Sequence, residues 1–195
     1  MIFFTIVIIF MPNFIKDPII NIIHNGIKRD IRIALEQECF RAAIILIYSG
    51  IDTMAYLNMP SNQDDVVKED FIYWAERYIH FPCKEQLTGV DLYGARCSML
   101  HHYGSSSRLS REGKCRQIVY FDNNVPEISY NPKISNEIII VSINGLAKAF
   151  FKGVDDFLVN LFADSDKAQI AESRLQKLMQ MLPFKEDTDV PHKKN

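Results

Sequence analysis

Apolar residues recur at helical spacing from Pro18 to Leu57. A short amphipathic stretch comes first, and Asn25-Gly26 is a candidate break after it. A longer run follows through Ile31, Leu35, Cys39, Ala42, Ile45, Leu46 and Ile47. Its second half, RAAIILIYSGIDTMAYL, is apolar on nearly every side, which is typical of a helix buried on several faces. This segment is therefore predicted to be the central helix of a bundle, ended by Pro60-Ser61-Asn62.

The same periodicity predicts four more helices. The second helix follows a cap at Asp64 or Asp65 and ends before Pro82, with a buried stripe of Phe71, Trp74, Ala75 and Tyr78. The third runs from Thr88 to Tyr103, because Thr88 and Asp91 have the spacing of a weakened capping box and Gly104 marks an end. Two later helices are expected around residues 146–161 and 167–182.

Short apolar runs between the third and fourth helices have a different character. Residues 117–121 and 128–130 are candidate strands, and 137–142 (EIIIVS) is either a third strand or the start of a helix. The predicted fold class is all-α: a bundle of about five helices with a small β-like insertion after the third main helix. We divide the chain into an apolar extension at 1–12, a helical domain at 13–184 and a disordered charged tail at 185–195.

The first eleven residues, MIFFTIVIIFM, are almost all apolar. A bilayer-spanning helix needs about 20 such residues, and the segment lacks the basic start and small-residue cleavage site of a signal peptide. Three interpretations stay open: an element packed on the domain, a weak interfacial anchor, or an upstream start codon chosen in place of Met11.

Composition and charge limit the classes of partner. The 195 residues are 48% hydrophobic and 24% charged, as in ordinary globular proteins, and the formal net charge is -2. No global charge attracts nucleic acid or anionic membrane, so a nucleic-acid site has to be a local basic patch. The four cysteines form no C-x-x-C pair, which favours reduced thiols and a cytoplasmic location without a membrane partner.

The third helix carries the residues with the clearest chemistry. Arg96 is followed by His101 and His102, and then by a polar segment whose cations are Arg108, Arg111, Lys114 and Arg116. Cleavage of RNA by its own 2′-OH needs proton transfer and positive charge on the phosphate. Histidine titrates near neutral pH, and arginine stays charged and grips phosphate oxygens. The pattern therefore indicates catalysis by Arg96 with His101 or His102, and phosphate contact by the four cations.

At these residues the chain resembles the HEPN superfamily, whose helical bundles often carry R-x(4–6)-H late in one helix. The resemblance covers about 18–182 in helix order. It implies a metal-independent ribonuclease of the toxin or phage-defence kind that acts on RNA without a cofactor. It also implies a homodimer that joins two motifs in one cleft, and a separate antitoxin protein as a further partner.

Two departures from that family pattern affect the site. The position after the arginine is commonly polar in the family, whereas this chain has Cys97, with Ser98 beside it. At 100° per residue His101 lies about 140° from Arg96 and His102 about 120° away on the other side. The site must therefore form across a dimer or at a distorted helix end. Glu36, Asp52 and Ser98 are candidates to orient Arg96.

Other interpretations of the same residues stay open. Arg96 could pair with a buried carboxylate such as Glu36, Glu38 or Asp52 in a purely structural role. Cys97 and His101 have the spacing of a metal-ligand pair, which Cys83, Cys115 or His102 could complete, although no second spaced pair exists. The rival functions are a non-catalytic bundle that binds RNA, a nucleotide or a protein, and a scaffolding bundle. We expect no metal.

Overall fold

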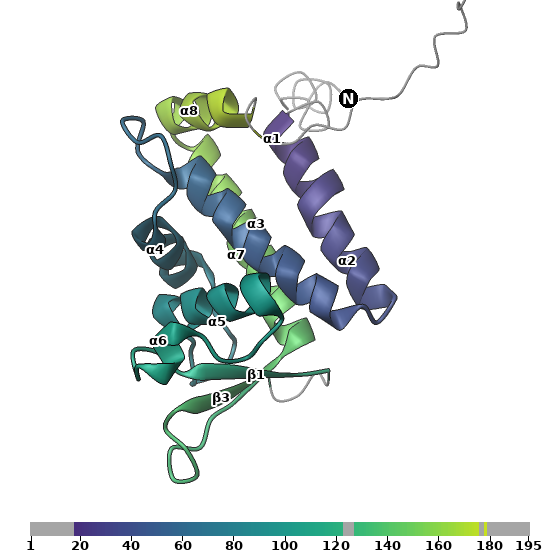
Figure 1. The fold of residues 1–195 in the computed structure, drawn as a ribbon. Coiled ribbons are helices and arrows are strands. Elements are labelled where there is room, and N and C mark those ends of the chain that lie inside the picture. The colour runs from purple at the N-terminus through teal and green to yellow at the C-terminus, as the bar shows by residue number, and fades with distance from the viewer. Residues whose placement is uncertain (1–17, 123–126, 176–177, 179–195) are drawn as a thin grey trace, which may run out of the picture.

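The computed structural model describes residues 18–122, 127–175 and 178. The helices are α1 (Pro18–Ile20), the π-helix η2 (Asn21–Ile27), α2 (Lys28–Glu36), α3 (Phe40–Asn58), α4 (Lys68–Tyr78), α5 (Gly89–His102), α6 (Arg108–Arg111), α7 (Ile143–Phe162) and α8 (Ser165–Leu175). The strands are β1 (Gln117–Phe121), β2 (Ile128–Ser129) and β3 (Ile138–Ser142). In Figure 1 the long helices α2, α3 and α7 form the body, with the sheet at one end and α8 at the other. The apolar extension at 1–12 and the tail at 185–195 lie outside the described residues.

The first two helical segments are divided differently from the sequence prediction. The chain stays helical through Asn25-Gly26 as η2, so the predicted break there is wrong. The actual break follows Glu36, where Glu38 has φ 54° and the Cys39 amide donates to the Ala34 carbonyl at 2.8 Å. This left-handed residue turns the chain so that α3 packs back against α2. The long helix predicted through Cys39 is therefore two helices.

Helix α3 is the central helix, as predicted. Ile47, Tyr48, Ile51 and Met54 are fully buried, and α3 contacts α2, α4, α5, α7 and α8. In the described part of the chain, α3 is the one helix long and apolar enough to cross a membrane, and half of that window is buried within the protein. Burial of this kind accounts for its apolar composition, because the core helix of a soluble protein passes the same test.

The start of α5 forms as the sequence predicts. The Thr88 hydroxyl accepts from the Asp91 amide at 3.1 Å, and Asp91 Oδ2 accepts from the Thr88 amide at 2.9 Å. At the other end Tyr103, with φ 52°, is the left-handed residue, and the Gly104 amide donates to the Ser98 carbonyl at 3.2 Å. The helix therefore ends at His102, two residues before the glycine that predicted its end. This fixes the position of the Arg96–His102 segment within the bundle.

The β-like insertion is a real three-stranded sheet, so the fold is mainly helical but not purely all-α. The order is β1-β3-β2: β3 lies in the middle, parallel to β1 and antiparallel to β2. Ile118 and Ile139 face the core, whereas Val119 and Ile140 are partly exposed. The open choice for residues 137–142 is thus settled as a strand, which leads directly into α7. The Tyr120 hydroxyl shares a hydrogen bond with Tyr48, so β1 is joined to α3.

Candidate functional site

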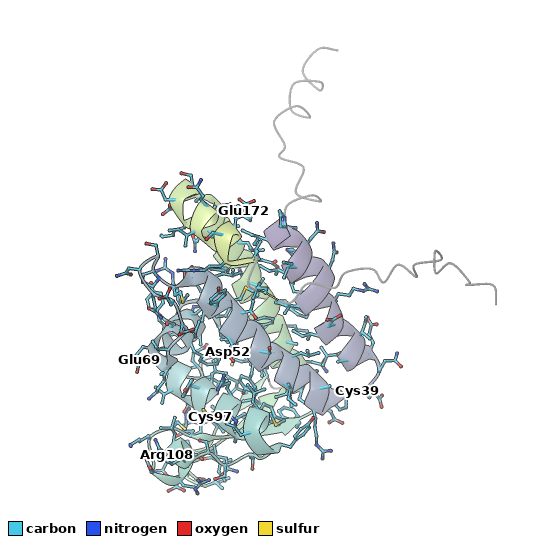
Figure 2. The ribbon with its side chains drawn as sticks, turned by 45° about the horizontal axis from the view of Figure 1, so that its top comes forward. Cys39, Asp52, Glu69, Cys97, Arg108 and Glu172 are labelled. Carbon is cyan, nitrogen blue, oxygen red and sulfur yellow. The ribbon has the colours of Figure 1, made fainter. Side chains whose placement is uncertain are left out.

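Arg96 lies on α5 and reaches across to α3. Its Nε donates to Asp52 Oδ2 at 3.0 Å, and the two side chains are 25% and 26% exposed. Burial raises the pKa of the Asp52 carboxyl above its usual value, and the neighbouring Arg96 offsets this only in part. Figure 2 shows Asp52 on α3 beside Cys97 on α5. The ion pair therefore joins two core helices and also leaves a cation partly open to solvent.

Tyr93 and Lys68 complete the surroundings of Arg96. The Arg96 guanidinium carbon lies 5.9 Å from the centroid of the Tyr93 ring, and Lys68 Nζ lies 5.7 Å from the same centroid. Phe71 holds that ring from the core side in an edge contact at 5.5 Å. Two cations at one aromatic ring form a small surface suited to an anion with a flat group, such as a nucleotide. Lys68 lies 28 positions before Arg96 in the sequence, and no motif links the two.

Both histidines of the motif lie at the C-terminal end of α5. His101 is exposed in the last turn of α5, and the described hydrogen bonds and ion pairs of Arg96 do not include it. His102 is the last residue of α5, and its side chain lies outside the described part of the protein. Helix α5 is regular up to Tyr103, so the angular separation expected from 3.6 residues per turn applies. Within the described residues of one protomer, no hydrogen bond or ion pair therefore joins Arg96 to His101.

The predicted phosphate-binding cations have two different environments. Arg108, Arg111 and Lys114 are exposed on and after α6; Glu112 pairs with Lys114 at 2.6 Å and with Arg108 at 3.6 Å. Arg116 instead donates to Asp91 through Nε and Nη2, donates to the Gln86 carbonyl, and lies 5.1 Å from the Tyr130 ring centroid. The positive charge of Arg116 is therefore paired with Asp91 inside the fold. The remaining three are the cations available to a ligand at this surface.

The three candidates for orienting Arg96 also separate. Asp52 binds it directly. Ser98 is buried and donates to the carbonyls of Gly94 and Ala95 within its own helix. Glu36 is exposed at the end of α2, and the described contacts of Arg96 do not include it. Of these candidates, Asp52 is the one that the structure brings to the arginine.

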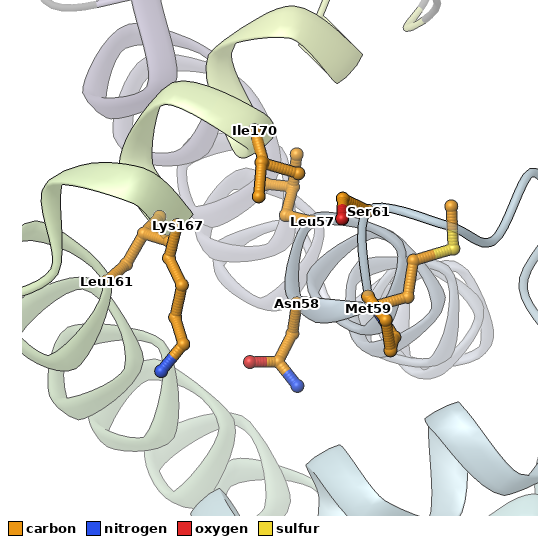
Figure 3. A pocket seen from close by; sticks show the side chains of 8 residues that line it. Leu57, Asn58, Met59, Ser61, Leu161, Lys167 and Ile170 are labelled. Atoms are coloured by element: carbon orange, nitrogen blue, oxygen red, sulfur yellow. The ribbon is translucent and has the colours of Figure 1, made fainter.

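An apolar cavity of about 360 Å³ lies at the far end of α3 (Figure 3). It is lined by Leu57, Asn58, Met59, Pro60, Ser61, Leu161, Lys167 and Ile170. Lys167 Nζ is 3.2 Å from Asp164, which neutralises the cation of the cavity wall. None of the eight lining residues belongs to the predicted site, so this cavity is separate from Arg96. It carries no group suited to acid–base chemistry.

A metal centre receives no support from the described residues. Within them, no three side chains of the His, Cys, Asp and Glu types gather closely enough to hold an ion. The four thiols are free. The metal-site alternative built on Cys97 and His101 would therefore need a ligand from outside the described part of the chain.

Comparison with known proteins gives no relative for this chain. No protein-family model matches the sequence, no curated protein matches it, and no solved structure is similar to the fold.

Proposed function

We propose that the chain is a metal-independent endoribonuclease of the HEPN type, a toxin or phage-defence effector. The observation that supports the proposal is the half-buried Arg96, whose Nε donates a hydrogen bond to Asp52. Among the described residues no carboxylate accepts from Nη1 or Nη2, the pair of nitrogens that a phosphate uses. Asp52 thus fixes the direction of the guanidinium, and the Arg96 side chain stays 25% exposed.

Each motif residue has one role in this reaction. Arg96 holds the scissile phosphate and stabilises the extra negative charge that develops when the 2′-OH attacks phosphorus. His101 takes the proton of the attacking 2′-OH as a base and then gives it to the 5′ leaving oxygen as an acid. The products are a 2′,3′-cyclic phosphate and a free 5′-OH, and no metal takes part. Arg108, Arg111 and Lys114 supply the positive surface that holds the flanking backbone.

The missing contact between Arg96 and His101 points to a site shared between two protomers. Consider two α5 helices packed antiparallel about a two-fold axis midway between these residues. Arg96 of one then lies level with the partner's His101, and the reverse holds by symmetry. Leu100 lies on the flank of α5 between the two residues, about 40° from Arg96 and about 100° from His101, so only an interface over that flank turns both toward the partner.

The first test uses the purified chain and a single-stranded RNA of mixed sequence. We expect cleavage that persists in excess EDTA and leaves 2′,3′-cyclic phosphate ends, because the mechanism uses the RNA's own hydroxyl. An identically purified Arg96→Ala protein controls for contaminating nucleases. Cleavage that stops in EDTA and returns with a divalent cation would refute the metal-independent mechanism.

The second candidate is a non-catalytic module that binds RNA. The observation in its favour is the surface of Tyr93, Lys68 and Arg96, which can hold a base and a phosphate without proton transfer. RNA binding that is weakened by Arg96→Ala, with no cleavage by the wild-type protein, would establish this candidate in place of the nuclease. An antitoxin partner and a cytoplasmic location are part of the nuclease proposal and depend on it.

A further inference from the structure

Two cysteines from different elements approach one another on the surface of α5. A Cβ placed on Gly94 would collide with Cys115 Sγ, so the Cys115 side chain occupies the space that this glycine leaves empty. Cys97 is three residues further along the same helix. Positions three apart have Cβ atoms about 5–6 Å from each other. The Cys115 sulfur therefore lies about one helical turn from the Cys97 side chain.

The Cys97 side chain leans over the preceding turn of α5, next to Tyr93 and Arg96. Side chains on a helix lean toward its N-terminus, over the residues three and four positions earlier, which here are Gly94 and Tyr93. Cys97 interacts with the Tyr93 hydroxyl, as this lean requires. Burial is the largest cause that raises the pKa of the Cys115 thiol, and the nearby Cys97 adds to that rise. Figure 2 shows Cys97 on the part of α5 that faces the α6 segment with Arg108.

Both thiols are partly exposed, and Cys115 lies outside the helices and strands. Cys97 and Cys115 are free and partly exposed. Cys115 lies in the turn between α6 and β1, whose backbone is not held in a helix or a strand. A disulfide needs Cβ atoms about 3.8 Å apart, so the bond requires this turn to move toward Cys97.

We infer that Cys97 and Cys115 form a reversible intramolecular disulfide when the protein meets a low-molecular-weight disulfide such as oxidised glutathione. The Cys97 thiolate attacks one glutathione sulfur, which gives a mixed disulfide and releases one glutathione thiolate. The Cys115 thiolate then attacks the Cys97 sulfur, closes the protein disulfide and releases the second glutathione. Two protein thiols lose their protons, and the oxidant is reduced to two glutathione molecules.

This bond would act on the surface already proposed for RNA. It would fix the turn after α6, with its cations Arg108, Arg111 and Lys114, to the residue next to Arg96. It would also remove the Cys97 thiol from Tyr93 and bring added bulk beside the guanidinium. This consequence for activity rests on the proposed ribonuclease function, whereas formation of the bond does not.

The test incubates the full chain with oxidised glutathione and measures its intact mass and its non-reduced peptide map. We expect a loss of about 2 Da and a cross-linked Cys97–Cys115 peptide, both reversed by dithiothreitol. Cys97→Ser and Cys115→Ser should each stop at a glutathione adduct on the remaining thiol. Cys39→Ser and Cys83→Ser are matched controls and should still form the bond. Glutathione adducts at both cysteines of the wild-type chain, with no cross-linked peptide, would overturn the inference.

A second arm measures RNA cleavage by the reduced and oxidised forms. We expect the oxidised wild type to cleave more slowly and the oxidised Cys115→Ser protein to stay closer to its reduced rate. A cross-link in a protein that never cleaves RNA would leave the disulfide established and refute the nuclease. RNA cleavage without a cross-link would establish the nuclease and refute the disulfide.

Discussion

Replacing Arg96 with alanine should lower the rate of RNA cleavage on the order of 100- to 1000-fold, the loss typical when one charged or hydrogen-bonding group at a transition state is removed. The effect should fall on kcat, because the positive charge matters most when the phosphate gains negative charge. His101→Ala should lose at least about 100-fold, as expected for a general acid or base. Both are measured with one RNA substrate at fixed salt. Activity within a few-fold of wild type for either variant would contradict the assigned roles.

Loss of structure has to be separated from loss of catalysis at Arg96. Its removal leaves Asp52 without its partner at a half-buried position, so some destabilisation is expected. Arg96→Lys keeps the charge and loses the paired nitrogens, and should remain folded but slow. Arg77→Ala is the matched control: Arg77 is an exposed arginine on α4 that donates to Tyr73. It should leave cleavage unchanged.

Replacing Asp91 with alanine should destabilise the whole domain by about 3–5 kcal/mol, the range for removing one member of a buried ion pair. Asp91 is 3% exposed at its side chain and accepts from the Thr88 amide and from the Arg116 amide, Nε and Nη2. Alanine there leaves Arg116 without its carboxylate and weakens the start of α5. Urea unfolding, monitored by circular dichroism, measures the loss in the free energy of unfolding.

A control and a pH dependence test this role of Asp91. Thr88→Ala removes the other half of the cap alone and should cost about 1 kcal/mol. Burial by itself would raise the pKa of Asp91, but the bonds from Arg116 and Thr88 outweigh it and hold the pKa below its usual value. A depressed folded-state pKa adds stability above the unfolded value near 4, and this stability is lost as pH falls through the folded pKa. Acidification should therefore lower the free energy of unfolding of the wild type by more than that of the Asp91→Asn protein. A loss of stability below about 1 kcal/mol in the Asp91→Ala protein would refute this role of Asp91.

Local chemistry explains which parts of the fold the sequence predicts. The Thr88–Asp91 pair sets the start of α5 through its own hydrogen bonds, so it can be identified without knowledge of the rest of the fold. The stripe of Phe71, Trp74, Ala75 and Tyr78 follows helical periodicity, and α4 buries all four residues. Both signals depend only on residues that lie within a few helical turns of one another in the sequence.

Features that depend on distant residues were not available from the sequence. Glu38 takes a left-handed conformation in a run whose apolar periodicity continues through Cys39, so periodicity alone predicts a single helix. The position of β3 between β1 and β2 is a matter of long-range pairing. The choice of Asp52 over Glu36 as the partner of Arg96 depends on how α3 packs against α5, since both acids are in helical segments. The position of Lys68 at the Tyr93 ring likewise depends on how α4 packs against α5.

The shared site is the central claim, and mixing two inactive variants tests it most directly. Arg96→Ala and His101→Ala proteins are assayed alone, then together after a brief unfolding and refolding step that exchanges subunits. In a mixed dimer one site holds the intact Arg96 of one subunit and the intact His101 of the other. We therefore predict that about a quarter of wild-type activity returns, since half of the dimers are mixed and each has one complete site. No recovery, with subunit exchange confirmed by differently tagged chains, would contradict a site built from two protomers.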